Sequence, residues 1–161
     1  MISYMNGNQL FPKQKQLKYE TMNRVIKFRG KCIKSGDMVF GDLIHGVGHK
    51  NGKVYILPHR ENLAYVKHCD PLDGVEVDPS TVGQFTGLCD KNGKEIFEGD
   101  VLQGVSNNTF SKGLVNKYKI MWGIDHWHAD RTNFTLQELF NYCANNIAVT
   151  GNIHDNPELL K

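Results

Sequence analysis

The amino-acid sequence predicts a mainly β protein, α+β at most, with one short helix. Short runs rich in β-branched and aromatic residues recur along the chain, and turn signals containing glycine or asparagine separate them. A single segment near the C-terminus has helical periodicity. The chain has 161 residues, of which 40% are hydrophobic and 22% are charged. These values are typical of a folded protein that buries a core, and they exclude the intrinsically disordered class.

The first predicted unit, residues 22–78, begins with a hairpin. From Ile26, apolar and basic residues alternate with period two, which predicts a half-buried strand with a solvated basic outer face. The basic side chains on that face are Lys27, Arg29 and Lys31. The turn signal at 34–37 and the apolar run 38–44 predict the returning strand of the hairpin.

The remainder of this unit contains further short strands. Asn51-Gly52 is a strong signal for a tight turn, and residues 54–57 form the outgoing strand. Short strands are also predicted at 63–66 and 75–77, after which a proline-containing segment breaks the chain. We therefore expect a boundary between two units near residue 78.

Residues 81–102 carry the most specific local signals. The turn at 90–94 contains Asn-Gly and predicts a hairpin between short strands at 87–89 and 95–97. A second turn signal, Glu-Gly-Asp, follows and leads into a strand that starts at Val101. This stretch therefore begins the second predicted unit, residues 79–161.

The second unit continues with a long loop at 104–113, extended residues at 114–122 and another extended piece from Trp127. Residues 135–138 then have the form of a capping box, which predicts the start of the short helix. Apolar residues follow with helical spacing at Leu136, Leu139, Phe140 and Cys143. A closing strand at 147–150 completes the unit, and most aromatic residues of this half are expected to fill its core.

Three segments together resemble the YopX family, small proteins encoded by phages and prophages. They are TVGQFTGLCDKNGKEIFEGDVL (81–102), IKFRGKCIKSGDMVFGDLI (26–44) and VTGNIHDNPELL (149–160). Their order and spacing match the family from Met22 onward. The resemblance implies a two-part fold whose second half is an SH3-like β-barrel, and it implies a phage or prophage origin. It implies no activity, because the family has no established catalytic or binding residues.

The formal net charge of +2 comes entirely from the first 21 residues, where three lysines face one glutamate. This polar segment lacks hydrophobic periodicity, and we expect residues 1–21 to be a flexible arm or an extension from an upstream start codon. The remaining chain is formally neutral, which argues against nucleic-acid binding through a broad basic surface. The sequence shows no apolar run that would export the chain or span a membrane, so we expect a cytoplasmic protein of the bacterial host.

The strongest candidate for a metal site is the sequence His-x-His-x-Asp formed by His126, His128 and Asp130. In an extended segment these alternate residues project on one face and could present two imidazoles and a carboxylate to a metal ion. The pattern is similar to the start of the HxHxDH motif of metallo-β-lactamases, but Arg131 stands where the final histidine is needed. A polar surface strand around a buried Trp127 explains the same residues.

Other catalytic patterns are weaker. No Walker loop, GxSxG elbow, HExxH motif or CxxC pair is present, so the sequence predicts no cofactor and no complete catalytic constellation. Glu95, Glu98 and Asp100 lie close together in a turn region, where solvation of the turn explains them better than acid/base catalysis.

These observations favour a non-enzymatic phage accessory protein that acts by protein binding or self-assembly. A homo-oligomer is expected because small β units present exposed sheet edges, and a phage or host protein is the other class of partner. The alternative is a nucleic-acid-binding module that uses the basic row with exposed aromatic residues. The outside alternative is a metal-dependent hydrolase at the His-x-His-x-Asp segment.

Overall fold

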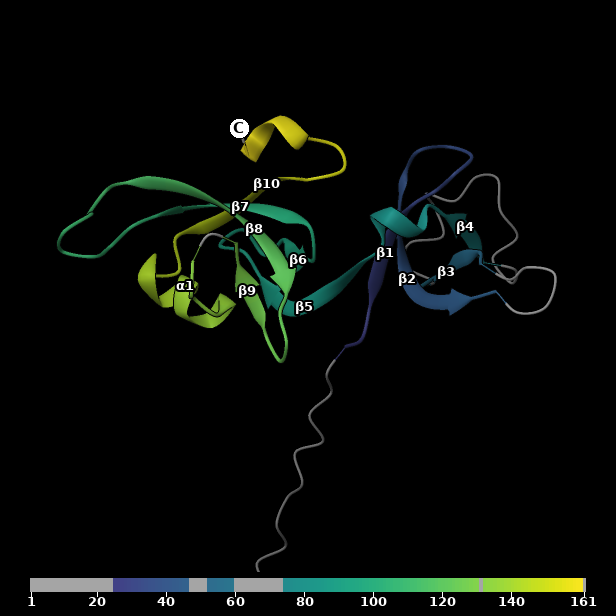
Figure 1. Cartoon of the computed structure of the whole chain (residues 1–161), viewed down its shortest axis with the longest axis horizontal. Coiled ribbons are helices and arrows are strands. Elements are labelled where there is room, and N and C mark those ends of the chain that lie inside the picture. Colours follow the sequence, from purple (N-terminus) through teal and green to yellow (C-terminus); the bar gives the residue numbers. More distant parts are fainter. Residues whose placement is uncertain (1–24, 47–51, 60–73, 131, 161) are drawn as a thin grey trace, which may run out of the picture.

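The computed structural model describes residues 25–46, 52–59, 74–130 and 132–160. In these ranges, ten strands form two antiparallel sheets, accompanied by one α-helix and short 3-10 helices (Figure 1). The predicted mainly β fold with one short helix is therefore confirmed. The predictions for residues 1–21, for Asn51 in the second hairpin turn and for a strand at 63–66 lie outside the described residues.

The first sheet contains six strands in the order β4-β3-β2-β1-β5-β6. Their bounds are β1 (Phe28–Lys31), β2 (Met38–His45), β3 (Val54–Pro58), β4 (Val75–Val77), β5 (Gly83–Cys89) and β6 (Glu95–Phe97). Every neighbouring pair is antiparallel. Residues 83–86 lengthen the strand that the sequence predicted at 87–89, and this added part of β5 reaches β1.

Strands β1 to β4 curl until the outer edge of β4 meets the end of β1. Cys32 and Val77 form a β-bridge there, and the N–H of Asp78 donates to the carbonyl of Lys31 at 2.9 Å. The apolar core enclosed by the curl consists of Cys32, Val39, Val54, Ile56, Val75 and Val77. The outer edge of β4 is therefore partly paired, which reduces its capacity to add a strand from another chain.

The second sheet contains four strands in the order β10-β7-β8-β9. Their bounds are β7 (Asp100–Val105), β8 (Val115–Trp122), β9 (Trp127–Ala129) and β10 (Ile147–Asn152). Helix α1 (Leu136–Tyr142) packs against this sheet. Their shared core consists of Ile96, Leu102, Tyr118, Ile120, Ala129, Leu136, Leu139, Phe140, Cys143 and Ile147.

Helix α1 begins with the capping box that the sequence predicted. The hydroxyl of Thr135 accepts the N–H of Glu138 at 3.1 Å, and the Glu138 carboxylate accepts the N–H of Thr135 at 2.8 Å. Positive φ angles at Ala144 and Asn145 end the helical segment. Among the described residues, no helix combines the length and apolar character needed to cross a membrane.

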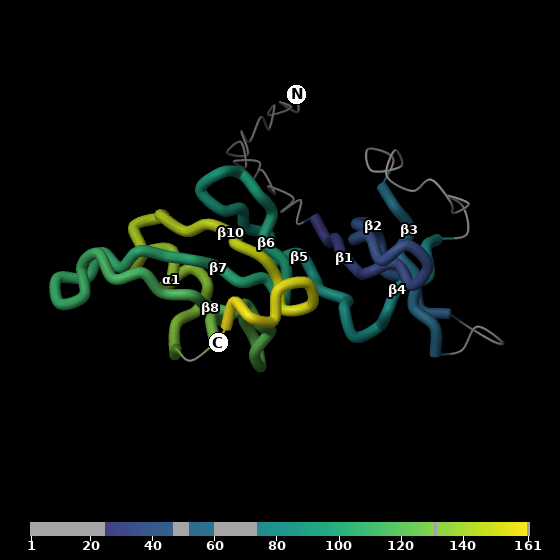
Figure 2. The backbone as a smooth tube through the Cα atoms, turned by 90° about the horizontal axis from the view of Figure 1, so that it is seen from above, coloured from purple at the N-terminus to yellow at the C-terminus, as the bar shows by residue number. Residues whose placement is uncertain are grey.

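The predicted boundary near residue 78 coincides with the 3-10 helix η3 (Pro79–Thr81), and the first sheet continues across it. After η3, β5 returns along β1 and places Gly83 opposite Arg29. Figures 1 and 2 show β1–β4 on one side and β7–β10 on the other, with β5 between them. The division into units 22–78 and 79–161 stays a prediction, as does the SH3-like form of the second unit.

The second sheet also has contacts along its outer strands. The N–H of Lys91 donates to the carbonyl of Ile147 at 3.0 Å, and the Asp90 carboxylate accepts the N–H of Val149 at 2.9 Å. On the opposite side, β9 makes a bridge to Thr135. Both outer strands are therefore partly covered by the chain itself.

We expect Gly104→Ala to destabilise the second core by about 1–3 kcal/mol, because a Cβ at Gly104 would lie 2.6 Å from Cys143 Sγ. Cys143→Ala removes the clashing atom, so the double variant should lose less stability than the sum of the two single variants. Urea unfolding of the four proteins measures this coupling. Strictly additive losses would contradict the close approach of β7 to the end of α1.

Candidate functional site

The predicted basic row of β1 faces the second half of the chain instead of solvent. Lys27 is 9% exposed and Arg29 is 6% exposed. The prediction of a solvated outer face is therefore wrong for these two residues, because acidic side chains from the second half lie opposite them. We call this contact the ion-pair seam, and its acidic members are Glu95, Asp100 and Asp155.

Two pairs of the seam are partly exposed. Lys27 Nζ lies 2.7 Å from Glu95 Oε2, and Lys31 Nζ lies 2.6 Å from Asp155 Oδ1. The side chains of Lys31 and Asp155 are 35% and 38% exposed, so solvent screens their attraction. Pairs of this kind contribute about 0–1 kcal/mol to stability. They orient the two halves more than they stabilise them.

The central pair, Arg29 and Asp100, is buried. Arg29 Nη1 lies 2.5 Å from Asp100 Oδ1, and the two side chains are 7% and 1% exposed. Arg29 Nη2 also donates to the carbonyl of Glu98 at 2.9 Å, and the guanidinium lies 5.1 Å from the centre of the Phe97 ring. The second carboxylate oxygen of Asp100 accepts the N–H of Phe97 at 2.8 Å. Both charges therefore have charged and neutral partners within the protein.

Burial raises the pKa of Asp100 above its ordinary value, and the charge of Arg29 and the N–H of Phe97 act against it. The ionised carboxylate is therefore tolerated because the guanidinium lies next to it. Arg29 is the largest influence that opposes burial. Without Arg29, the pKa of Asp100 would therefore rise further.

The sequence suggested that the carboxylates of Glu95, Glu98 and Asp100 solvate a turn. This prediction is wrong for Asp100. This residue is the first of β7 and is almost fully buried. The signal that could have identified it is the position of an acidic residue directly before the buried strand residues Val101 and Leu102. A carboxylate at such a position requires a cation in the folded protein.

The turn at residues 153–156 brings another titratable side chain to the seam. His154 lies near Arg29, Lys31, Asp78 and Asp155. Burial and the charge of Arg29 lower the pKa of His154. Sequence reasoning did not identify His154 as part of any site, because its neighbours come from three separate segments of the chain.

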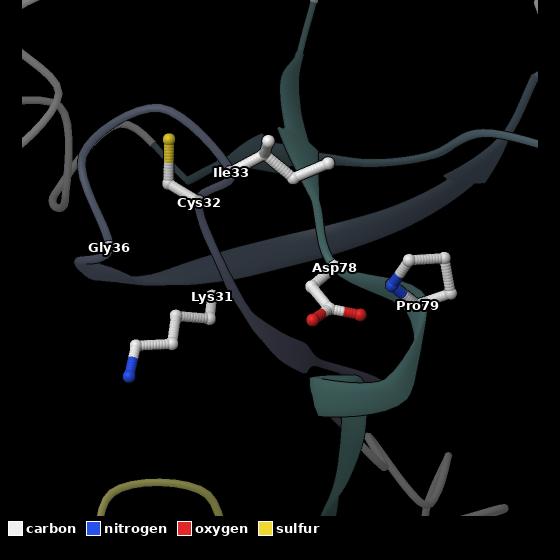
Figure 3. A pocket seen from close by; sticks show the side chains of 6 residues that line it. All are labelled: Lys31, Cys32, Ile33, Gly36, Asp78 and Pro79. Carbon is white, nitrogen blue, oxygen red and sulfur yellow. The ribbon is translucent and has the colours of Figure 1, made fainter.

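A shallow pocket lies beside the seam, at the end of β1. Its lining residues are Lys31, Cys32, Ile33, Gly36, Asp78 and Pro79. Burial raises the pKa of the Cys32 thiol, but hydrogen bonds from the Ser35 hydroxyl and from nearby backbone outweigh burial and leave this pKa below its ordinary value. Figure 3 shows that the side chains of Lys31, Cys32 and Asp78 point in different directions. They therefore do not form a nucleophile with an oriented base.

The predicted metal-binding residues are not gathered by β9. The imidazole of His126 contacts the adjacent Asp125 at 2.5 Å, and the rings of His126 and His128 have centres 6.0 Å apart. The Asp130 carboxylate accepts the N–H of Lys119 at 2.7 Å. Within the described ranges, no three His, Cys, Asp or Glu side chains form a group that could hold a metal ion. Metal binding here stays a prediction without an assembled ligand set.

The aromatic residues of the second half divide into two groups. Phe97, Tyr118 and Phe140 are buried in the protein, as the sequence suggested for most of them. Phe110 is fully exposed, and Trp122 is 47% exposed and contacts Trp127 edge-on, with ring centres 4.7 Å apart. The exposed aromatic residues lie on the β7–β8 and β8–β9 hairpins.

The fold and the seam define a class of β protein in which two antiparallel sheets are joined through a buried ion pair. Residues 27–161 match the family model described as YopX protein, so the chain belongs to the YopX family. This finding confirms the resemblance inferred from the three sequence segments. The family assignment covers most of the chain, including the seam.

Comparison with solved structures shows the same fold in the crystal structure of protein EF1440 from Enterococcus faecalis. The match has a TM-score of 0.52 and 21% sequence identity, and it covers 85% of this chain and 99% of EF1440. A comparison with curated proteins found no match. At 21% identity the structural likeness defines the fold and carries no activity with it.

We expect Arg29→Met to cost about 3–5 kcal/mol of unfolding free energy, because it leaves Asp100 buried without its cation. The matched variant Lys31→Met, on the same strand face, should cost less than about 1 kcal/mol, since its pair is partly exposed. Urea denaturation at neutral pH measures both losses. Equal losses for the two variants would show that burial does not distinguish the pairs of the seam.

Proposed function

We propose that this protein is a non-enzymatic phage or prophage accessory protein that acts by self-assembly or by binding another protein. Membership of the YopX family supports the class of protein. In this proposal, the second half is an SH3-like barrel that presents a binding hairpin, and the protein acts in the cytoplasm of a bacterial host.

The observation that carries the proposal is the hairpin formed by β7 and β8, which extends away from the sheets (Figure 1). Phe110 is 100% exposed on this hairpin, Leu114 is 56% exposed and Val115 is 53% exposed. Scattered apolar residues are normal on protein surfaces, but several large ones on one projecting element indicate a contact surface. Their burial against a partner would contribute about 25 cal/mol for each Å² removed from water.

Hydrogen bonds hold the loop of this hairpin in one conformation. The Ser111 hydroxyl lies 2.7 Å from the hydroxyl of Ser106 and 2.7 Å from that of Tyr142. The N–H of Asn107 donates to the carbonyl of Tyr142 at 3.0 Å. Because Tyr142 belongs to α1, the loop is tied to the core of the second sheet. An ordered loop loses less conformational entropy on binding, which favours recognition by the hairpin.

A second copy of the chain is the first partner that we propose. Residues from 22 onward carry no net formal charge, so two copies have little long-range repulsion. Strand addition is disfavoured at three of the four outer strands, β4, β9 and β10, because these already have partial contacts along their outer edges. A phage or host protein with an apolar groove is the other occupant that this hairpin would suit.

The nucleic-acid alternative has less support than the sequence suggested. Lys27 and Arg29 are paired with acidic residues inside the protein. Contact with phosphates would require these cations to leave their partners, which for Arg29 means exposing a buried pair. The basic row therefore favours a structural role.

The double variant Phe110→Ser/Leu114→Ser tests the proposal. We expect the wild-type protein to form an oligomer and the variant to dissociate at least about tenfold more readily, because contact residues of this kind dominate association. Native mass spectrometry and light scattering after size-exclusion chromatography, across a concentration series, measure the subunit number.

The matched control is Ile33→Ser/Ile44→Ser, which removes two exposed apolar side chains from the half of the protein that contains β1–β4. Ile33 is 58% exposed and Ile44 is 42% exposed. This control should leave the subunit number unchanged. A wild-type protein that remains monomeric at about 100 μM would rule out self-assembly as its function. An equal effect of both double variants would show that the hairpin has no special part in the contact.

A further inference from the structure

We propose that the turn at residues 153–156 is an acid-sensitive latch that fastens the second half of the protein to β1. The turn follows β10 of the second sheet and pairs with the end of β1 in the first sheet. Opening of the turn would therefore loosen one end of the ion-pair seam. This inference rests on the geometry of the seam and is independent of the proposed self-assembly.

One side of the latch is anchored to the second half. The N–H of Ile153 donates to the carbonyl of Gly99 at 3.0 Å. The side-chain oxygen of Asn152 accepts the N–H groups of His154 and Asp155, each at 2.9 Å. These bonds give the turn its shape, in which Asp155 reaches Lys31 at the end of β1. A Cβ added at Gly99 would lie 3.4 Å from His154 Nε2, so the imidazole packs beside the Gly99 backbone at the start of the second sheet.

The other side of the latch is the ion pair between Asp155 and Lys31, with 2.6 Å between Oδ1 and Nζ. The side-chain amide of Asn152 donates to the second oxygen of this carboxylate at 2.8 Å, which fixes its orientation. Since the pair is partly exposed, its contribution to stability is small. A change of charge beside it therefore shifts the balance between the closed and the open turn.

His154 lies where such a change would act. The charged groups that face it are Arg29 and Lys31 of β1, Asp78 before η3, and Asp155 of the turn itself. Burial is the largest influence that lowers the pKa of His154, followed by the charge of Arg29, while Asp155 and Asp78 act in the opposite direction. Protonation in the closed turn places a third cation beside Arg29 and Lys31 in a partly buried position.

The direction of the pH dependence follows from this lowered pKa. The open turn exposes His154 to water, where its pKa returns toward about 6.5, so the open form binds more protons than the closed form. Closure is therefore fully favoured above about pH 6.5, and the closed population falls as the pH drops below this value. Hydrogen bonds from Lys31 and from Ser80 lower the pKa values of Asp155 and Asp78, respectively, so both carboxylates stay ionised in this range.

The test uses hydrogen exchange of the full-length protein between about pH 7.5 and about pH 5, with rates corrected for the intrinsic pH effect. We expect the protection of the amides of residues 153–155 to fall by about threefold or more on acidification, while the amides of β7 stay protected. In the variant His154→Gln, which cannot gain a proton, protection of the turn should not change with pH. The matched control His59→Gln, which lies after β3 and away from the turn, should show the same pH dependence of protection as the wild type.

If His154→Gln folds poorly, a titration of the wild-type protein tests the same inference. The imidazole of His154, followed by NMR in the wild-type protein, should titrate with a midpoint below about 6.5. A midpoint at or above that value would overturn the proposal. So would a turn whose protection is constant over the pH range, or one that opens in acid equally in the wild type and in His154→Gln.

Discussion

A buried guanidinium and a buried carboxylate are stable in a protein interior when they face each other and their remaining polar atoms are satisfied. Arg29 and Asp100 face each other although they lie 71 positions apart in the sequence. Both carboxylate oxygens and both terminal guanidinium nitrogens have partners, and Arg29 Nε is the buried polar atom of the pair that has none. Arg29 lies on β1 of the first sheet, and Asp100 is the first residue of β7 in the second sheet. Because both charges are buried, the pair helps to set the relative position of β1 and β7. A displacement of either strand would leave a charge buried without its partner.

The same constraint explains why β1 has a polar face without being a surface strand. Its alternate residues point either into the core enclosed by β1–β4 or toward the seam. At Gly30 an added Cβ would lie 2.9 Å from Val77, so the strand is closely packed on its apolar side. On the other side, Lys27 and Arg29 are covered by the β5–β7 region. Polar residues can thus occupy a buried strand face when another part of the chain supplies the opposite charges.

The elements that depend on neighbouring residues could be predicted from the sequence. The turn at 90–94 and the Thr135 capping box are determined by residues a few positions apart, and both are present. The seam could not be predicted, because the partner of Arg29 depends on how two distant segments pack. For the His-x-His-x-Asp segment, alternation predicted a common face. However, β9 has three residues, so His126 and Asp130 lie outside it, and the Asp130 carboxylate accepts the N–H of Lys119.

The seam and the projecting hairpin differ in the interactions that maintain them. The seam depends on ionised groups, and its cations are engaged by acidic residues of the same chain. The hairpin loop depends on hydroxyl and backbone hydrogen bonds to Tyr142, and its exposed residues are apolar. Moderate acid does not change the charge of the groups that hold the hairpin loop, whereas opening of the proposed latch would loosen one end of the seam. For this reason, opening of the proposed latch would leave the hairpin and its exposed apolar residues in place, so the latch and the proposed self-assembly have separate effects.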